Sequence, residues 1–284
     1  MLPPGAILIL GASALALGCV VGSFLNVCIY RMPRDRSIVS PPSHCPQCGG
    51  RLRAVDLVPL ASFLFLGRKC RFCGGAISWR YFAVELITGL VFLIVWLACG
   101  PGPSVVPCWI FASVVIAVVF TDLDHMIIPD KLVLAGLAAA LVAEALVAAR
   151  GEAGLLLVSL PGTELMVPRL LAGGLLGLGV FVFIRAFSQL LFRREGMGLG
   201  DVKLAGAIGA MLGPTLALVS FGLAILAGAV LGVLLLVTRV RRRMEYLPFG
   251  PFLAAAALAT LVAPGFLMAA TRECYLRWTG AFAP

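Results

Sequence analysis

The chain has 284 residues, of which 61% are hydrophobic and 12% are charged, and its formal net charge is +9. A mean hydropathy of +1.07 excludes a soluble globular domain of this size, because such a domain needs a charged surface around its core. The excess of positive charge does not predict a nucleic-acid partner, since the basic residues lie beside apolar segments that they would orient in a membrane. We therefore expect an all-α protein that crosses the lipid bilayer several times.

Apolar segments long enough to cross a bilayer recur along the chain. The first has no basic stretch before it and is longer than the apolar part of a signal peptide, so we expect it to be retained as a helix. The sixth is short and bounded by Gly213-Pro214, and by hydropathy alone it could merge with the seventh. We predict about eight spans, at residues 6–29, 81–99, 105–121, 131–149, 169–190, 202–216, 218–238 and 249–270.

The distribution of Lys and Arg predicts the orientation of these spans. If residues 31–80 are cytoplasmic, eighteen of the 22 basic residues lie inside and four lie outside, as the positive-inside rule requires. Keeping the basic residues of 191–201 and of 239–243 on one side requires an even number of crossings between them, which favours a short helical hairpin there. The predicted domains are 1–30 as the first transmembrane helix, 31–80 as a cytoplasmic domain and 81–284 as a helical membrane domain.

Four of the nine cysteines form two C-x2-C pairs that are separated by 21 residues, and a glycine pair follows each. Glycine allows the tight turns that aim backbone N–H groups at sulfur, and four thiolates make a closed tetrahedral zinc site. Two disulfides are the alternative, but the reducing cytoplasm disfavours them. Zinc would also stabilise the fold of this domain of about 50 residues, which is too short to form a stable hydrophobic core by itself. The predicted ligands of this zinc-ribbon-like domain are Cys45, Cys48, Cys70 and Cys73.

The remaining cysteines and the two histidines carry no such pattern. A buried thiol beside an apolar run is an ordinary small hydrophobic group. His44 precedes the first ligand, and with four thiolates available we expect it to be solvated, as we do His125. The cysteines expected to be hydrophobic groups are Cys19, Cys28, Cys99, Cys108 and Cys274.

Acidic residues gather at the ends of the predicted spans on the inner face. Asp122, Asp124 and Asp130 follow the third span, and Asp201 precedes the sixth. Solvation at the membrane interface would explain any one of them. A carboxylate inside the membrane costs free energy, so such residues usually have a function. If Asp122 and Asp201 meet, two inequivalent carboxyls could share one proton and activate water at a peptide carbonyl.

The segment around Asp201 is rich in glycine, which lets a substrate backbone approach closely. The dipole at a helix N-terminus favours an ionised Asp201, whereas Asp122 lies near a helix C-terminus, which disfavours charge. A glycine-rich helix start also binds phosphate, so this alternative stays open. The candidate supporting residues of this loop are Gly198, Gly200 and Lys203.

The motifs, taken together and in order, resemble those of the type IV prepilin peptidases, which are membrane aspartic proteases of the GxGD class. The resemblance rests on Gly22-Ser-Phe-Leu-Asn-Val-Cys-Ile-Tyr-Arg-Met-Pro33, the two cysteine pairs, Ile77-Ser-Trp-Arg-Tyr81 with Glu85, the stretch from Asp122 to Asp130, and Gly198-Leu-Gly-Asp201.

This resemblance implies a function and assigns two residues. Asp122 and Asp201 would be the catalytic pair, which removes the short basic leader of type IV prepilins or secretion pseudopilins at the cytoplasmic face of the bacterial inner membrane. Many members also methylate the new N-terminus with S-adenosylmethionine, using the cysteine-bearing domain. The five residues between Asp122 and Ile128-Pro129 match the family spacing, so Asp124 is expected to be solvated beside His125 and Lys131.

Three other functions remain as alternatives. The protein could be a protease only, with a structural zinc domain. It could be a transporter that relays protons or cations through its acids, although such proteins place carboxylates in mid-span. It could also be a membrane scaffold whose zinc domain recruits a secretion partner.

Overall fold

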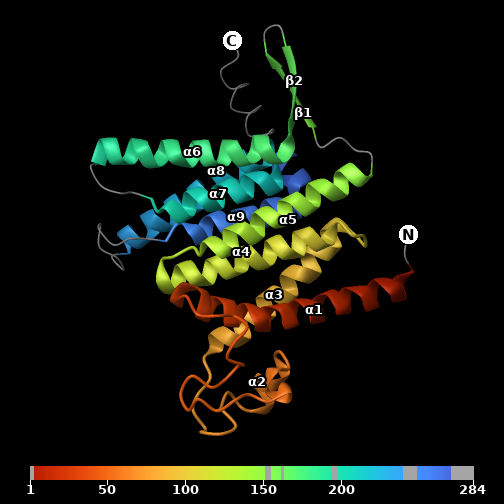
Figure 1. Ribbon diagram of the computed structural model, residues 1–284, viewed down its shortest axis with the longest axis vertical. Helices are drawn as coiled ribbons and strands as arrows, with labels where there is room; N and C mark the ends of the chain where they lie inside the picture. Colours follow the sequence, from red (N-terminus) through yellow and green to blue (C-terminus); the bar gives the residue numbers. More distant parts are fainter. Residues whose placement is uncertain (1–2, 151–154, 161–162, 193–196, 239–247, 270–284) are drawn as a thin grey trace.

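The computed structural model describes residues 3–150, 155–160, 163–192, 197–238 and 248–269, and helices dominate it. Within these ranges, eight helices of 13 or more residues correspond to the eight predicted spans, and they pack into one bundle (Figure 1). The helices are α1 (Pro4–Arg31), α3 (Trp79–Cys99), α4 (Val105–His125), α5 (Asp130–Ala149), α6 (Arg169–Phe192), α7 (Leu199–Leu212), α8 (Pro214–Val237) and α9 (Gly250–Val262).

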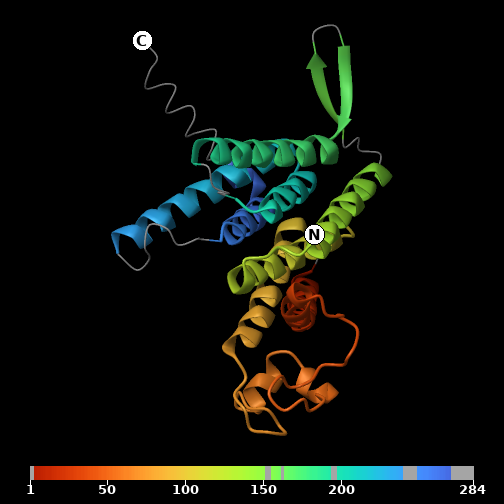
Figure 2. The ribbon, with the colours of Figure 1, turned by 60° about the vertical axis from the view of Figure 1, so that its left-hand side comes forward.

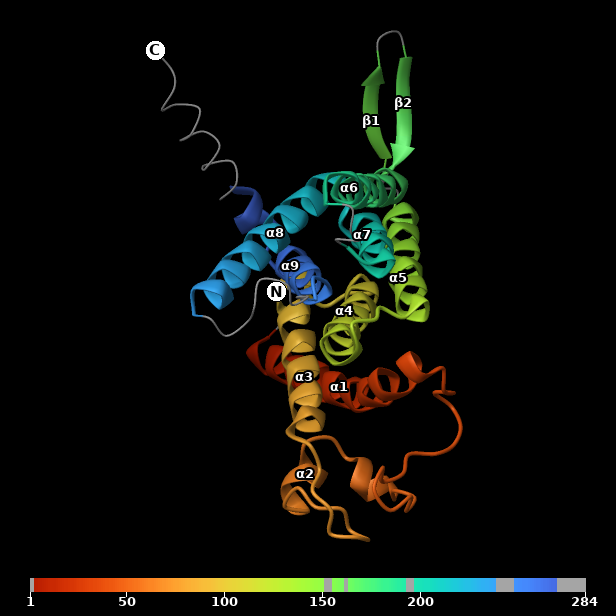
Figure 3. The same cartoon turned by 90° about the vertical axis from the view of Figure 1, so that its left-hand side faces the viewer.

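Six of these helices are long and apolar enough to cross a membrane, which confirms a multi-pass membrane protein. The other two, α7 and α9, have 14 and 13 residues. At 1.5 Å per residue each is about 20 Å long, shorter than the hydrocarbon core of roughly 30 Å. Most residues of α7 are buried, and Figure 3 shows this helix enclosed by α5, α6, α8 and α9. A short helix inside a bundle can be held by its neighbours rather than by lipid.

The predicted hairpin between the sixth and seventh spans is present. Gly213 joins α7 to α8 with φ +76°, and Pro214 begins α8. A left-handed φ favours glycine, and proline suits the first turn of a helix, where no N–H is needed. The break therefore lies at Gly213, a few residues before the predicted boundary between 216 and 218.

A β-hairpin in the connection between α5 and α6 was not predicted. Strands β1 (Leu155–Leu160) and β2 (Thr163–Pro168) pair antiparallel, with Leu155 opposite Pro168 and Leu160 opposite Thr163. Figure 2 shows the hairpin projecting away from the helices. The sequence held a signal, because Pro161-Gly162 is a turn dipeptide between two short apolar runs.

Glycines let two pairs of helices approach closely. A Cβ on Gly18 of α1 would lie 2.7 Å from the Thr88 carbonyl of α3, and one on Gly89 would lie 2.5 Å from Cys19 Sγ. Between α6 and α7 the fit is tighter, since a Cβ on Gly173 would lie 2.0 Å from the Gly209 carbonyl. Small residues at such contacts are how membrane helices gain packing without a hydrophobic driving force.

The segment between α1 and α3, residues 35–78, forms the cysteine module, which Figure 1 shows below the helices. It contains the 3₁₀ turn Ala54–Leu57 and the short helix α2 (Ala61–Phe65), and a further 3₁₀ turn, Met32–Arg34, leads into it. The Leu60 N–H donates to Glu85 Oε2 of α3 at 2.8 Å. The Phe63 ring lies 5.1 Å from that of Trp79. These contacts seat the module on the start of α3.

Candidate active site and metal site

Asp122 and Asp201 lie at neighbouring helix ends, as expected. Asp122 is in the last turn of α4, and Asp201 is in the first turn of α7. The two carboxyl groups are near enough for the charge of one to act on the other. Helix α4 ends at Met126, where φ is +53° and the N–H donates to the Asp122 carbonyl at 2.8 Å. The chain therefore leaves α4 within one turn of Asp122 and crosses to α5.

Gly250, which the sequence analysis did not identify, is the third component of this site. A Cβ on it would lie 2.5 Å from Asp122 Oδ2, and its backbone amide faces the Asp122 carboxyl group. Asp122 therefore meets the N-terminus of α9, whose dipole favours an anion, although it lies near the C-terminus of its own helix. The only signal in the sequence was glycine between two prolines, Pro248-Phe-Gly-Pro251, at a helix start.

Ile128 packs between the elements that carry the two aspartates. It is buried, and a Cβ on Gly200 would lie 3.0 Å from its own Cβ. On its other side, a Cβ on Gly250 would lie 3.3 Å from Ile128 Cδ1. Glycine at both positions lets the linker after α4 lie against α7 and α9, which draws the aspartates together. Gly198, the N-cap of α7, faces the Asp201 carboxyl group.

Each aspartate keeps a buried oxygen that is free to accept a hydrogen bond. Among the residues that the structure describes, neither Asp122 Oδ2 nor Asp201 Oδ1 has a hydrogen-bond partner, and only 6% of Asp122 is exposed. A buried acceptor without a partner costs free energy, so it points to a group that binds there in function. Two such oxygens on adjacent carboxyls can hold a water and a substrate carbonyl between them.

Lys203 does not face the two carboxyl groups. Its Nζ lies 2.7 Å from Asp130 Oδ1 in a largely exposed ion pair. Two residues along a helix turn the side chain by about 200°, so Lys203 and Asp201 point to opposite sides of α7. The structure thus brings together Asp122, Asp201, Gly198 and Gly200, and leaves Lys203 outside.

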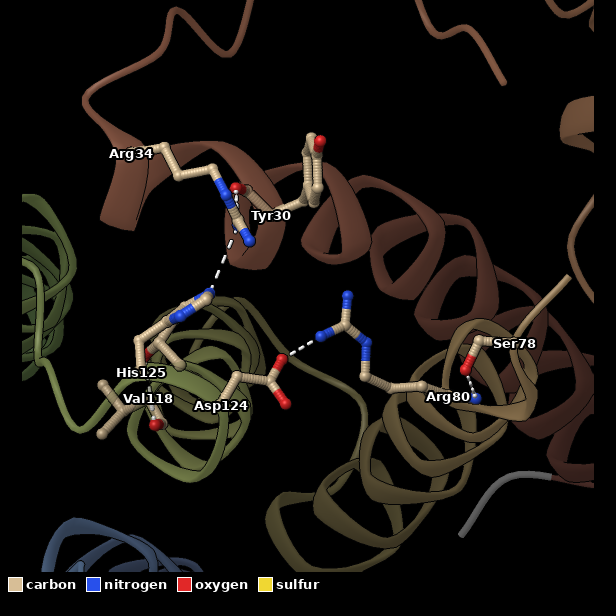
Figure 4. Close-up of polar contacts among 8 residues, drawn as sticks. Tyr30, Arg34, Ser78, Arg80, Val118, Asp124 and His125 are labelled. Atoms are coloured by element: carbon tan, nitrogen blue, oxygen red, sulfur yellow. Dashed lines mark hydrogen bonds and ion pairs between the residues drawn. The ribbon is translucent and has the colours of Figure 1, made fainter. Parts of the chain in front are cut away.

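Asp124 and His125 bind two arginines that flank the cysteine module in the chain (Figure 4). Asp124 forms an ion pair with Arg80 in the first turn of α3, and His125 Nε2 lies 3.3 Å from Arg34 Nη1. The Asp124 side chain is 30% exposed. Asp124 is thus exposed, as expected, but its partner is Arg80 of α3 rather than a residue of the loop that holds Lys131.

The four cysteine thiols of the module converge on one point. Their Sγ atoms all lie within 4.8 Å of one another, and those of Cys45 and Cys73 are 4.0 Å apart. Tetrahedral zinc with Zn–S bonds of about 2.3 Å requires sulfur atoms about 3.8 Å apart. The four thiols therefore have a geometry that fits a tetrahedral metal site.

The two knuckles have the same backbone geometry. The Cys45 N–H donates to the Gly50 carbonyl at 2.9 Å, and the Cys70 N–H donates to the Gly75 carbonyl at 2.8 Å. Gly49 and Gly74 hold φ of +71° and +69°, values that other residues adopt only with strain. His44 binds elsewhere, with Nδ1 3.0 Å from the Pro42 carbonyl.

The other described cysteines differ in their surroundings. Cys19 and Cys28 are buried, as expected of small hydrophobic groups. Cys99 is exposed and its Sγ lies 3.8 Å from that of Cys108, so these two are not ordinary core residues. Cys274 lies outside the described residues.

Comparison with known families accounts for most of the chain. Residues 16–99 match the bacterial peptidase A24 N-terminal domain, and residues 109–233 match the type IV leader peptidase family. The chain belongs to the type IV leader peptidase family. The N-terminal match covers the cysteine module, and the second match covers both aspartates.

Individual members of this family are similar over most of this chain. A prepilin leader peptidase/N-methyltransferase of Aeromonas salmonicida (strain A449) is 32% identical over 268 residues, which cover 86% of this chain and 87% of the relative. A protein of the same name from Dickeya chrysanthemi is 34% identical and covers 87% of this chain and 90% of its own length. The corresponding protein of Myxococcus xanthus (strain DK1622) is 36% identical over 79% of this chain and 63% of the relative. No solved structure shows a significant match to the chain.

Proposed function

We propose that this leader peptidase removes the short leader of type IV prepilins or secretion pseudopilins at the cytoplasmic face of the bacterial inner membrane, with Asp122 and Asp201 as its catalytic pair. The observation that carries this proposal is the convergence of the two buried carboxyl groups, each with an oxygen free to accept a hydrogen bond. Membership of a peptidase family favours this function over a transporter or a scaffold.

The two carboxyl groups would act by general acid–base catalysis. One deprotonates a water molecule that lies between them, and the other protonates the scissile carbonyl or the leaving amine. The hydroxide adds directly to the carbonyl carbon, so no covalent enzyme intermediate forms. Gly198, Gly200 and Gly250 leave room for the substrate backbone beside the carboxyl groups, because none of them projects a side chain into the site.

We also propose that the cysteine module binds structural zinc and takes part in methylating the new N-terminus. The relatives in Aeromonas and Dickeya are named as N-methyltransferases, a reaction for which S-adenosylmethionine supplies the activated methyl group. Cys45, Cys48, Cys70 and Cys73 would hold the zinc as four thiolates. A cytoplasmic position for residues 31–80 agrees with the distribution of basic residues.

The test is cleavage of a pilin-like precursor by the purified full-length protein in detergent. The wild-type protein should shorten the precursor by its leader, and Asp122→Asn and Asp201→Asn should each abolish the product in a gel or mass-spectrometric assay. Asparagine keeps the shape of the side chain but cannot exchange a proton. If either variant cleaved at the wild-type rate, the proposed pair would be refuted.

A further inference from the structure

Two cysteine thiols meet where α3 joins α4, at the ends of these helices that lie away from the cysteine module and the aspartates. Cys99 is the last residue of α3, and Cys108 lies in the first turn of α4. Their Sγ atoms are 3.8 Å apart. At 1.5 Å per residue, about 20 Å of α4 separates Cys108 from Asp122. Both thiols also lie outside the metal cluster.

Packing between the two helices holds these thiols together. The Trp109 ring is stacked on that of Phe92, with centroids 5.1 Å apart and an interplanar angle of 3°, and its Nε1 donates to the Phe92 carbonyl at 3.0 Å. Val105 and Trp96 belong to one buried apolar cluster, against which Cys108 packs. The start of α4 is therefore fixed against the last turns of α3.

The geometry of the pair suits a disulfide. The sulfur atoms of a disulfide are about 2.05 Å apart, so bond formation brings these two atoms about 1.8 Å closer, a distance within reach of a side-chain rotation. The two thiols differ in their access to solvent, because Cys99 is exposed and Cys108 is half-buried. An oxidant in solution therefore reaches Cys99 first.

In the orientation that the proposed function assigns, this pair lies on the opposite side of the membrane from the zinc ligands. Helix α3 is a candidate span of 21 residues, about 30 Å long and enough to cross the hydrocarbon core. It begins next to the cytoplasmic cysteine module, so its end, with Cys99, faces the outer side. Disulfides form and persist in that oxidising environment, whereas cytoplasmic thiols stay reduced and can bind metal.

We propose that Cys99 and Cys108 form a disulfide at the outer face of the membrane. The proposal rests on the orientation in the proposed function and adds a covalent modification site to it. The bond ties α3, on which the cysteine module is seated, to α4, which carries Asp122. Because the bond lies far from the aspartates, it stabilises the fold and takes no part in the cleavage reaction. It does so mainly by restricting the unfolded chain.

The oxidant is a protein or small-molecule disulfide on the outer side. The Cys99 thiolate attacks one sulfur of that disulfide, forms a mixed disulfide and releases the first thiolate. The Cys108 thiolate then attacks Cys99 Sγ, which forms the bond within the chain and releases the second thiolate. The two protons lost by the cysteines end on the released thiolates. The pair has thus lost two electrons, and the oxidant leaves as two thiols.

The first test maps the thiols of the wild-type, full-length protein. Cells are treated before lysis with an alkylating reagent that blocks free thiols, and the protein is purified in detergent without reductant, digested and analysed by mass spectrometry. We expect linked peptides that contain Cys99 and Cys108, lighter by two hydrogen atoms than the separate peptides. Alkylation of both thiols, or a bond from either one to Cys274, would overturn the proposal.

The second test measures the thermal midpoint with and without a phosphine reductant, in a buffer that contains zinc. Reduction should lower the midpoint of the wild-type protein by about 5 °C. The double variant Cys99→Ser, Cys108→Ser should match the reduced wild-type protein and should not respond to the reductant. This variant is the matched control, because any effect of the reductant on the zinc cluster appears in it too. An equal response of both proteins would contradict the proposal.

Leader cleavage distinguishes this proposal from the proposed function. The double variant should cleave the precursor at the wild-type rate at temperatures where both proteins are folded, and a loss of cleavage there would refute the purely stabilising role. A mapped disulfide in a protein that cleaves no precursor would support this proposal and count against the peptidase. Alkylated thiols in a protein that cleaves its precursor would refute the disulfide and leave the peptidase intact.

Discussion

The two aspartates have similar surroundings, although one lies at the end of its helix and the other at the start. Asp122 ends its own helix, yet it faces the backbone amide of Gly250 at the start of α9. Asp201 begins α7 and faces Gly198. Both carboxyls therefore lie at a helix N-terminus, which favours their charged forms, while burial and their mutual proximity oppose two charges. In the proposed mechanism, one proton shared by the pair would satisfy both demands.

A substitution at Asp124 tests whether an acid at the inner membrane interface is enough for catalysis, or whether the acid must lie on the side of α4 that holds Asp122. Asp122 and Asp124 point about 200° apart on the helix, and Asp124 binds Arg80 instead. A partly exposed ion pair contributes about 0–1 kcal/mol, so Asp124→Asn should fold and retain a substantial share of cleavage. The leader-cleavage assay checks this against Asp122→Asn. A variant of Asp124 as inactive as Asp201→Asn would show that the Arg80 contact is needed for catalysis.

The position of Gly250 in the aspartate site can be tested by adding a single methyl group. Gly250→Ala would place a methyl group 2.5 Å from Asp122 Oδ2, so the carboxyl group or α9 must move. A displacement of about 1 Å in a catalytic group can cost about a hundredfold in rate, and we expect a loss of this order in the rate of leader cleavage. The matched control is Gly222→Ala on α8, where no atom lies within 4 Å of an added Cβ. Equal rates for both variants would remove Gly250 from the site.

How far the site can be predicted from sequence depends on how local its contacts are. The spacing of the four cysteines predicts their convergence because each knuckle is a local turn. The proximity of Asp122 and Asp201 is predicted by the acidic and glycine residues near them in the sequence and by the resemblance to the family motifs. Gly250 could not be found this way, since only tertiary packing brings α9 to α4. Lys203 is two residues from Asp201, and this interval turns its side chain to the other side of α7, where it pairs with Asp130.

At the scale of elements, α7 is held by its contact with α6. The two backbones touch where Gly173 meets Gly209, and this contact fixes the helix that begins with Asp201. Gly173→Ala would drive a Cβ to 2.0 Å from the Gly209 carbonyl, and such overpacking costs about 1–3 kcal/mol. We expect a lower thermal midpoint and reduced cleavage.

The control for this prediction lies on the same helix. Gly179→Ala adds a methyl group where nothing lies within 4 Å, and alanine favours a helix over glycine. Its midpoint should equal or exceed that of the wild-type protein. If Gly173→Ala were as stable as Gly179→Ala, the α6–α7 contact would be looser than the structure indicates.

Hydropathy predicts the helices well because each span must satisfy its own backbone hydrogen bonds in lipid. The break at Gly213 follows from a local signal, glycine before proline. The β-hairpin at residues 155–168 was missed because its strands are short apolar runs, which have no period that separates them from helix. Nor does hydropathy reveal that α7 is held mainly by neighbouring helices.

At the scale of the whole molecule, residues that flank the cysteine module contact the end of α4, which carries Asp122. Arg34 meets His125 and Arg80 meets Asp124 (Figure 4), and both contacts are partly exposed. The aspartates themselves are positioned by α4, α7 and α9. The two proposed activities should therefore be separable, since only methyl transfer would depend on the module's fold.

Removing a zinc ligand tests this separation. The module, residues 35–78, is too short to bury a core of its own, so losing the metal should unfold it. In Cys45→Ser and Cys73→Ser we expect loss of zinc by mass spectrometry, faster protease digestion within residues 35–78, and loss of methylation. Leader cleavage should persist in part, because the helices that carry Asp122 and Asp201 keep their packing.

Cys99→Ser is the matched control, since Cys99 is an exposed cysteine outside the metal cluster, and this variant should retain zinc and both activities. Unchanged metal content in both Cys45→Ser and Cys73→Ser would refute the zinc site. Complete loss of cleavage, at wild-type levels of membrane insertion, would instead mean that the seated module orients the end of α4. Adding zinc back to the metal-stripped wild-type protein would then measure how much of that orientation the metal supplies.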